Sequence, residues 1–205
     1  MITLSTLITV AVASFLLAIV PGPTVTVIIA NSLRAGTNAG LLNIGGTFLG
    51  GTCLVLVLAL GLETVISIMG EAFFWIKLVG AAYLVWIGIK LLRSDGKIGD
   101  SDKVEAPKFG YFWQGFFVII TNPKALFFLG AFIPQFVSVN NDAFFQTFLL
   151  GMIFVIIGAS SDCIYAVLAG KAGTWLTRSK VRILEMGSGL CLIGGGVWLA
   201  LTRRG

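Results

Sequence analysis

Six apolar segments, separated by short polar connections, make up most of this 205-residue chain. They cover residues 4–33, 39–62, 73–92, 111–137, 144–168 and 183–201. A helix needs about 20 apolar residues to cross the hydrocarbon core of a bilayer, and each segment is about that long or longer. The pattern predicts an all-α integral membrane protein with six transmembrane helices.

The composition indicates that lipid is the solvent for most of the chain. Hydrophobic residues make up 57% of the sequence and charged residues 11%, whereas about a quarter of the residues of a soluble domain are charged. Six spans and their connections leave no room for a soluble catalytic domain, so we expect the protein not to be an enzyme. The net charge is +5, but the basic residues lie between apolar segments, where they set topology, and we expect no nucleic-acid partner.

The basic residues are distributed unequally between the two sides of the predicted membrane domain. Ten lie in or beside the connections that follow the first, third and fifth segments: Arg34, Lys90, Arg93, Lys97, Lys103, Lys108, Lys171, Arg178, Lys180 and Arg182. Three lie on the opposite side: Lys77, Arg203 and Arg204. Cytoplasmic loops are enriched in Lys and Arg, so we expect the three basic loops in the cytoplasm and both termini outside it.

The two halves of the chain show a weak internal similarity. The first apolar segment is interrupted at Pro21-Gly22-Pro23 and the fourth at Asn122-Pro123. We interpret residues 1–93 and 111–205 as two three-helix repeats that a cytoplasmic loop, 94–110, joins. An odd number of spans gives the two copies opposite orientations, so the sequence predicts a 3+3 inverted repeat, a common plan of secondary transporters. The similarity is poor residue by residue, and a chance match is the alternative.

The two proline interruptions predict a polar site inside the membrane. Proline removes a backbone donor, and the freed carbonyl groups need partners in hydrocarbon. Proline also suits the first position of a new half-helix, whose exposed, partially positive amides bind anions. The predicted substrate-binding residues are Pro21, Gly22, Pro23, Thr24, Asn122, Pro123 and Lys124. The alternative is that the prolines only kink two helices for packing.

Two charged residues lie deep in predicted spans. Lys124 follows the second interruption, and a lysine at that depth costs a few kcal/mol unless it meets water or an anion. The anion is a substrate carboxylate or Asp162; snorkelling of Lys124 to the interface is the alternative. Asp162 suits proton coupling, because a carboxylate can bind and release a proton during transport. A static partner of Lys124 and a ligand for a substrate ammonium group are the other two roles open to it.

Cysteine positions bear on metal and cofactor sites, and glycine positions bear on helix packing. Cys53, Cys163 and Cys191 form no Cys-x-x-Cys pair, and the chain has no histidine, so we expect no metal site and no cofactor. The small-residue pattern Gly46-x-x-x-Gly50 lets two helices approach closely. It favours packing within the bundle, with a homodimer interface as the alternative.

The order of these motifs resembles the LysE/RhtB family of amino-acid exporters. The matching stretches are Pro21-Gly22-Pro23, Ser32-Leu33-Arg34-Ala35-Gly36, Gly80-Ala81-Ala82-Tyr83-Leu84, Asn122-Pro123-Lys124-Ala125 and Phe132-Ile133-Pro134-Gln135-Phe136. The resemblance implies proton-driven efflux of amino acids or related small metabolites from the bacterial inner membrane, with both proline interruptions in the substrate pathway. Many members of the family have an Asp or His near the position of Gly51, and that residue's role does not carry over to this chain.

Three other functions fit the sequence less well than a secondary exporter. A metal-cation exporter needs several converging carboxylates, thiols or imidazoles, and one buried Asp beside a buried Lys argues against it. A membrane redox carrier needs paired cysteines. An assembly protein has little reason to retain Lys124 and Asp162 within its spans. We therefore expect a proton-coupled antiporter whose partners are membrane lipid, protons and a small zwitterionic or anionic metabolite.

Overall fold

The computed structural model describes residues 2–19, 21–68, 107–138, 142–171 and 178–201, and a few positions between 78 and 93. Every element in these ranges is helical: α1 (Leu4–Ile19), α2 (Pro23–Ala35), α3 (Thr37–Ile68), α5 (Tyr111–Ile120), α6 (Pro123–Phe127), the π-helix η2 (Phe128–Phe132), the 3₁₀ helix η3 (Ile133–Phe136), α7 (Ala143–Lys171) and α8 (Arg178–Leu201). The all-α prediction is confirmed for this part of the chain. Most of the predicted third segment, 73–92, lies outside the described residues.

Two helices are long and apolar enough to cross a bilayer unbroken: α7, and α3 over Thr37–Gly61. Two further candidate spans each consist of a bent pair of helices. The axes of α1 and α2 differ by 51°, and α5 and the helical stretch Pro123–Phe136 differ by 46°. The described helices therefore supply two candidate spans, or four if each bent pair counts as one, and the six-span arrangement stays a prediction.

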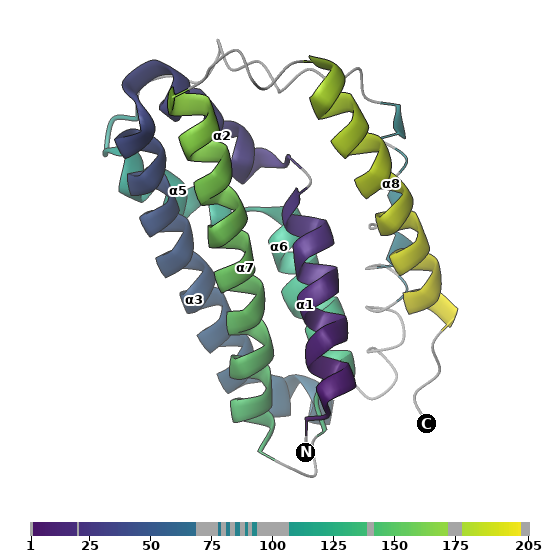
Figure 1. The fold of residues 1–205 in the computed structure, drawn as a ribbon. Helices are drawn as coiled ribbons and strands as arrows, with labels where there is room; N and C mark the ends of the chain where they lie inside the picture. The colour runs from purple at the N-terminus through teal and green to yellow at the C-terminus, as the bar shows by residue number, and fades with distance from the viewer. Residues whose placement is uncertain are drawn as a thin grey trace.

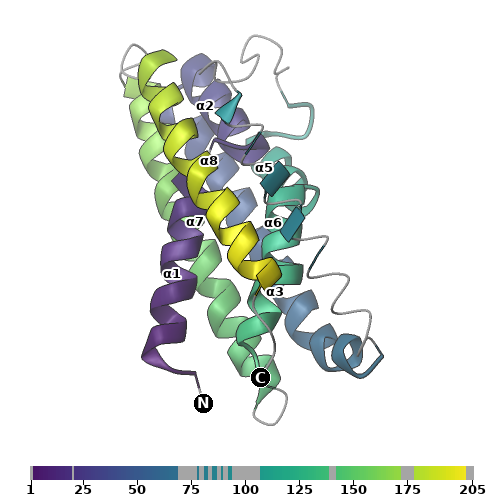
Figure 2. The same cartoon turned by 90° about the vertical axis from the view of Figure 1, so that its right-hand side faces the viewer.

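The two long helices form the centre of the bundle. α3 packs along α7, α5 packs on α3, and both α1 and α2 contact α7, while α8 lies against α1 (Figure 2). The core between these helices includes Val10, Leu17, Val55, Phe128 and Leu150. Large apolar side chains also cover the outer faces, as Val57 and Leu60 do at 70% and 72% exposed. This outward distribution is unfavourable in water and suits a protein surrounded by lipid.

Glycine brings α3 and α5 into close contact. A Cβ atom added at Gly46 would overlap the carbonyl oxygen of Phe112, and one added at Gly115 would overlap that of Asn43. A Cβ at Gly50 would come within 3.0 Å of the Phe116 carbonyl. The Gly46-x-x-x-Gly50 pattern therefore works within the bundle, as the sequence favours.

The ends of the helices show how the chain crosses the bundle. α1 begins and α8 ends at one end of the molecule, while the α2–α3 connection, the end of α7 and the start of α8 lie at the other (Figure 1). Basic residues gather at this second end, because Arg34 and Lys171 occupy the last turns of α2 and α7. Two of the ten basic residues that the sequence assigns to the cytoplasmic side, Arg34 and Lys171, therefore lie at the same end of the bundle.

Candidate functional site

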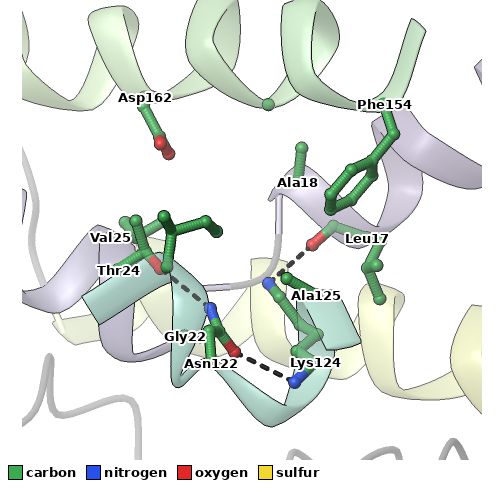
Figure 3. A pocket seen from close by; sticks show the side chains of 12 residues that line it. Leu17, Ala18, Gly22, Thr24, Val25, Asn122, Lys124, Ala125, Phe154 and Asp162 are labelled. Carbon is green, nitrogen blue, oxygen red and sulfur yellow. Dashed lines mark hydrogen bonds between the residues drawn. The ribbon is translucent and has the colours of Figure 1, made fainter. Parts of the chain in front are cut away.

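The two helix breaks lie next to each other at mid-height of the bundle (Figure 1). Pro23 and Pro123 begin α2 and α6 as predicted, and Asn122 is the N-cap of α6, with its side-chain oxygen accepting from the Lys124 amide at 2.9 Å. The same side chain donates from Nδ2 to the Thr24 hydroxyl at 2.8 Å (Figure 3). Asn122 therefore caps its own half-helix and joins it to the half-helix that begins at the other break.

Two side chains supply the hydrogen bonds that the prolines of the first break cannot. In an uninterrupted α-helix the Leu17 carbonyl would accept from residue 21, and the Ile19 carbonyl from residue 23. Both positions are proline and have no amide hydrogen. Lys124 Nζ donates to the Leu17 oxygen at 2.9 Å, and the Tyr165 hydroxyl donates to the Ile19 oxygen at 2.7 Å. Side chains from α6 and α7 thus satisfy backbone carbonyls of α1.

The second break is satisfied by its own backbone. Pro123 leaves the Ile119 carbonyl without its usual donor, and the Asn122 amide donates to that oxygen at 3.1 Å. The two breaks therefore differ, because the first depends on distant side chains and the second does not.

A cavity of about 50 Å³ opens between the breaks and α7. Its polar lining consists of Thr24, Asn122, Lys124 and Asp162. Gly22 also lines it, while apolar residues such as Leu17, Ala125 and Phe154 form the remaining walls. Of the predicted site residues, Pro21, Pro23 and Pro123 are not part of the lining and act through the breaks they create.

The side chains of Lys124 and Asp162 face this cavity from different helices, α6 and α7 (Figure 3). The cavity thus brings one basic and one acidic side chain together. Lys124 Nζ donates to the Leu17 carbonyl at 2.9 Å, so the lysine side chain reaches from α6 toward the end of α1. Gly22 leaves room for this reach, because a Cβ there would lie 3.3 Å from Lys124 Nζ and would displace it by a few tenths of an ångström.

The first turn of α2 also faces the cavity, through Thr24 and Val25. Gly22, the N-cap of α2, has no side chain to cap the helix. Within the described residues, the amides of Thr24 and Val25 have no hydrogen-bond acceptor. Such amides carry partial positive charge at a helix N-terminus and bind carboxylates.

Two features of the site region were not predicted. Tyr165 lies three residues after Asp162, on the same face of α7, and this spacing was the available signal. The other feature is a buried amide cluster, in which Asn31 Nδ2 donates to Asn43 Oδ1 and to Gln114 Oε1, both at 2.7 Å. Asn43 also donates to the Tyr111 carbonyl. Three amide side chains in apolar segments could have indicated that α2, α3 and α5 meet.

A polar cavity at interrupted helices, inside a bundle that is apolar on its outer faces, is the arrangement of a membrane transporter. The chain belongs to the LysE type translocator family, whose model matches residues 15–203. The resemblance read from the motifs is therefore confirmed, and the protein is a transporter of the amino-acid or metabolite exporter type.

Curated relatives match nearly the whole chain. The homoserine/homoserine lactone efflux protein of Salmonella typhimurium is 30% identical over 192 residues, which cover 93% of each chain. An uncharacterized membrane protein of Vibrio cholerae is 30% identical, over 91% of this chain and 92% of its own length. One from Synechocystis is 28% identical over 93% of both chains. No solved structure matches the chain.

Proposed function

We propose that this protein is a secondary active exporter that moves small amino acids or closely related metabolites out of the bacterial cytoplasm in exchange for protons. The observation that carries the proposal is the cavity in which Lys124, Asp162 and the uncapped start of α2 meet. Charged groups of both signs inside an apolar bundle are costly, and a zwitterion is the cargo that complements them. The Salmonella relative, named for the efflux of homoserine and homoserine lactone, supports this cargo class.

The cavity offers a distinct group for each charge of a zwitterion. The amides of Thr24 and Val25 provide the site for the cargo carboxylate, together with the ammonium group of Lys124. An ammonium group has three N–H donors, so Lys124 can hold the Leu17 carbonyl and still meet an anion. Asp162 provides the site for the cargo ammonium group. A metabolite that lacks one of the two charges uses only the matching half.

Asp162 also explains how export is coupled to protons. Its carboxylate holds either a proton or the ammonium group of the cargo, because protonation removes the charge that binds the ammonium. A proton arriving from outside therefore displaces the cargo, and a cargo molecule arriving from the cytoplasm requires that the proton has left. Each cycle then exchanges one for the other.

The membrane arrangement in this proposal is the one read from the sequence. Residues 1–93 and 111–205 are two inverted three-helix repeats joined by the loop 94–110, in the inner membrane, with both termini outside. The adjacent breaks and the basic end of the bundle support it. Fusing a reporter that is active only in the periplasm, and in parallel one that is active only in the cytoplasm, to the C-terminus tests the orientation.

Transport by purified protein tests the function directly. The protein is reconstituted into liposomes loaded with labelled L-homoserine or L-threonine, and a proton gradient is imposed in the direction opposite to cargo exit. We expect efflux to accelerate with the gradient and an uncoupler to abolish the acceleration. Efflux that ignores the gradient would retain the exporter and reject the proton coupling. Absence of efflux across a panel of small amino acids would reject the cargo class.

A further inference from the structure

A second cavity of about 50 Å³ lies beyond Asp162, between α3, α5 and α7. It shares Ile119, Phe154, Gly158 and Asp162 with the first cavity. Its remaining lining residues are Thr47, Phe48, Gly51, Val155 and Ala159. Asp162 therefore lies in the wall that the two cavities share.

The two cavities differ in chemistry. The first contains Lys124, Asn122 and the start of α2, whereas the second is lined mainly by aromatic and aliphatic side chains. Apart from the shared Asp162, its polar side chain is Thr47, and the Thr47 hydroxyl donates to the Ile44 carbonyl of its own helix at 3.0 Å. Among the described residues that line the second cavity, none besides Asp162 complements a further charge on a ligand.

We propose that this second cavity, the side-chain pocket, receives the side chain of the transported amino acid. The inference rests on the proposed function and extends it to selectivity. An α-amino acid carries its ammonium, carboxylate and side chain on one carbon atom. With the ammonium at Asp162 and the carboxylate at the start of α2, the side chain extends into the pocket on the other side of Asp162.

The size and lining of the side-chain pocket define the cargo class. A volume of about 50 Å³ accommodates roughly three to five water-sized groups, at about 10–15 Å³ each. The pocket therefore fits short, uncharged side chains, apolar or carrying one hydroxyl. Acidic and basic side chains are disfavoured because their charge would be left without a partner.

Gly158 is the residue at which a small added side chain would narrow this pocket. It lies one helical turn before Asp162 on α7, on the same face of the helix, and it lines both cavities. A Cβ atom added at Gly158 meets no atom within 4 Å. Gly158→Ala therefore fits the fold without displacing a neighbour and takes up space next to Asp162.

Val155 provides the opposite change. It is 6% exposed, lines only the side-chain pocket, and its Cγ2 lies 3.1 Å from a Cβ built on Gly51. Val155→Ala therefore enlarges the pocket. Gly61→Ala is the matched control, because Gly61 also lies in an apolar helix, its added Cβ also meets nothing within 4 Å, and it lines neither cavity.

The experiment measures export of alanine, 2-aminobutyrate, norvaline and norleucine by proteoliposomes that contain the full chain. These cargoes share one head group and differ by single methylenes, each worth about a fourfold change where it is buried. We expect Gly158→Ala to lower the kcat/KM ratio of norvaline to alanine by about fourfold or more. We expect Val155→Ala to raise that ratio, and Gly61→Ala to leave it unchanged.

The possible outcomes distinguish failure of the side-chain pocket from failure of the proposed exporter function. Equal loss for every cargo in Gly158→Ala, or an unchanged series in both pocket variants, would overturn the side-chain pocket while the exporter stands. Transport of none of the four cargoes by the unaltered protein would overturn both. If Gly158→Ala fails to accumulate in the membrane, the rise expected for Val155→Ala decides the question alone.

Discussion

The Lys124 ammonium group donates a hydrogen bond to the Leu17 carbonyl at 2.9 Å. In a continuous helix this carbonyl would accept from the amide of residue 21, which is absent because that residue is proline. Lys124 thus replaces the donor that Pro21 lacks, although the lysine lies 107 positions from its acceptor. Lysine at this depth has a structural task as well as the electrostatic one proposed for transport. The two roles can be separated by mutation, because the structural role is a single hydrogen bond to the Leu17 carbonyl, which another residue can donate instead.

Stability measurements on Lys124→Met and Pro21→Ala make that separation. The alanine in Pro21→Ala would offer an amide hydrogen to the Leu17 carbonyl, so this change should stabilise the protein more in the Lys124→Met background than in the unaltered chain. The expected difference is about 1–3 kcal/mol, the cost of a buried polar group left without a partner. Thermal unfolding in detergent measures it. An equal effect of Pro21→Ala in both backgrounds would show that the Lys124–Leu17 bond contributes nothing. Because Lys124→Met also removes the charge proposed to bind the cargo, we expect it to abolish export, and Pro21→Ala should not restore export in the double variant.

Tyr165→Phe tests the other replacement donor of the first break. The change removes only the hydroxyl that donates to the Ile19 carbonyl at 2.7 Å. We expect a loss of about 1 kcal/mol in unfolding free energy, as for one hydrogen bond. Tyr111→Phe is the control, since the Tyr111 hydroxyl makes no hydrogen bond within the part of the chain that the structure describes. Equal thermal midpoints for the two variants would contradict the assignment.

Local chemistry made the breaks predictable from sequence. Pro23 and Pro123 begin half-helices because proline suits the first helical position, and Asn122 caps α6 because an asparagine oxygen reaches the next amides. What could not be predicted is which side chains satisfy the carbonyls of the first break. Lys124 and Tyr165 lie 107 and 146 positions from their acceptors, and only the packing of α6 and α7 around α1 brings them there.

Helix ends and irregular helices were also beyond the sequence pattern. α3 continues to Ile68, past the predicted end at 62, because a helix can extend beyond the apolar stretch that crosses lipid and glutamate at position 63 favours helix. The predicted fourth helix, 111–137, changes to π and 3₁₀ geometry after Phe127. Pro134 lies in this stretch and supplies no amide hydrogen, so the regular α-helical pattern cannot continue through it.

A double-mutant cycle on Thr24 and Asn122 tests whether the hydrogen bond between the two helix breaks stabilises the protein. The Asn122 amide donates to the Thr24 hydroxyl at 2.8 Å, and both side chains are buried. Thr24→Val and Asn122→Ala should each destabilise the protein, and together by less than the sum, because the second change has no bond left to remove. The expected coupling is about 0.6 kcal/mol, the average for hydrogen bonds between membrane helices, and at most about 1.7 kcal/mol. Strictly additive losses would mean that the Thr24–Asn122 hydrogen bond contributes no stability and that the two breaks are not coupled.

Asp162→Asn tests the proposed coupling of export to protons. The amide keeps the shape of the carboxylate but can neither take up a proton nor attract an ammonium group, so gradient-driven export in proteoliposomes should fall to the protein-free background. Asp142→Asn is the matched control. Asp142 precedes α7 and its carboxylate accepts from the Phe145 amide at 2.9 Å, a cap that asparagine can also make, and export should be retained. Both variants should reach the membrane in equal amounts, which immunoblotting checks. Gradient-driven export that survives in Asp162→Asn would assign the proton to another residue, because a neutral amide cannot carry it.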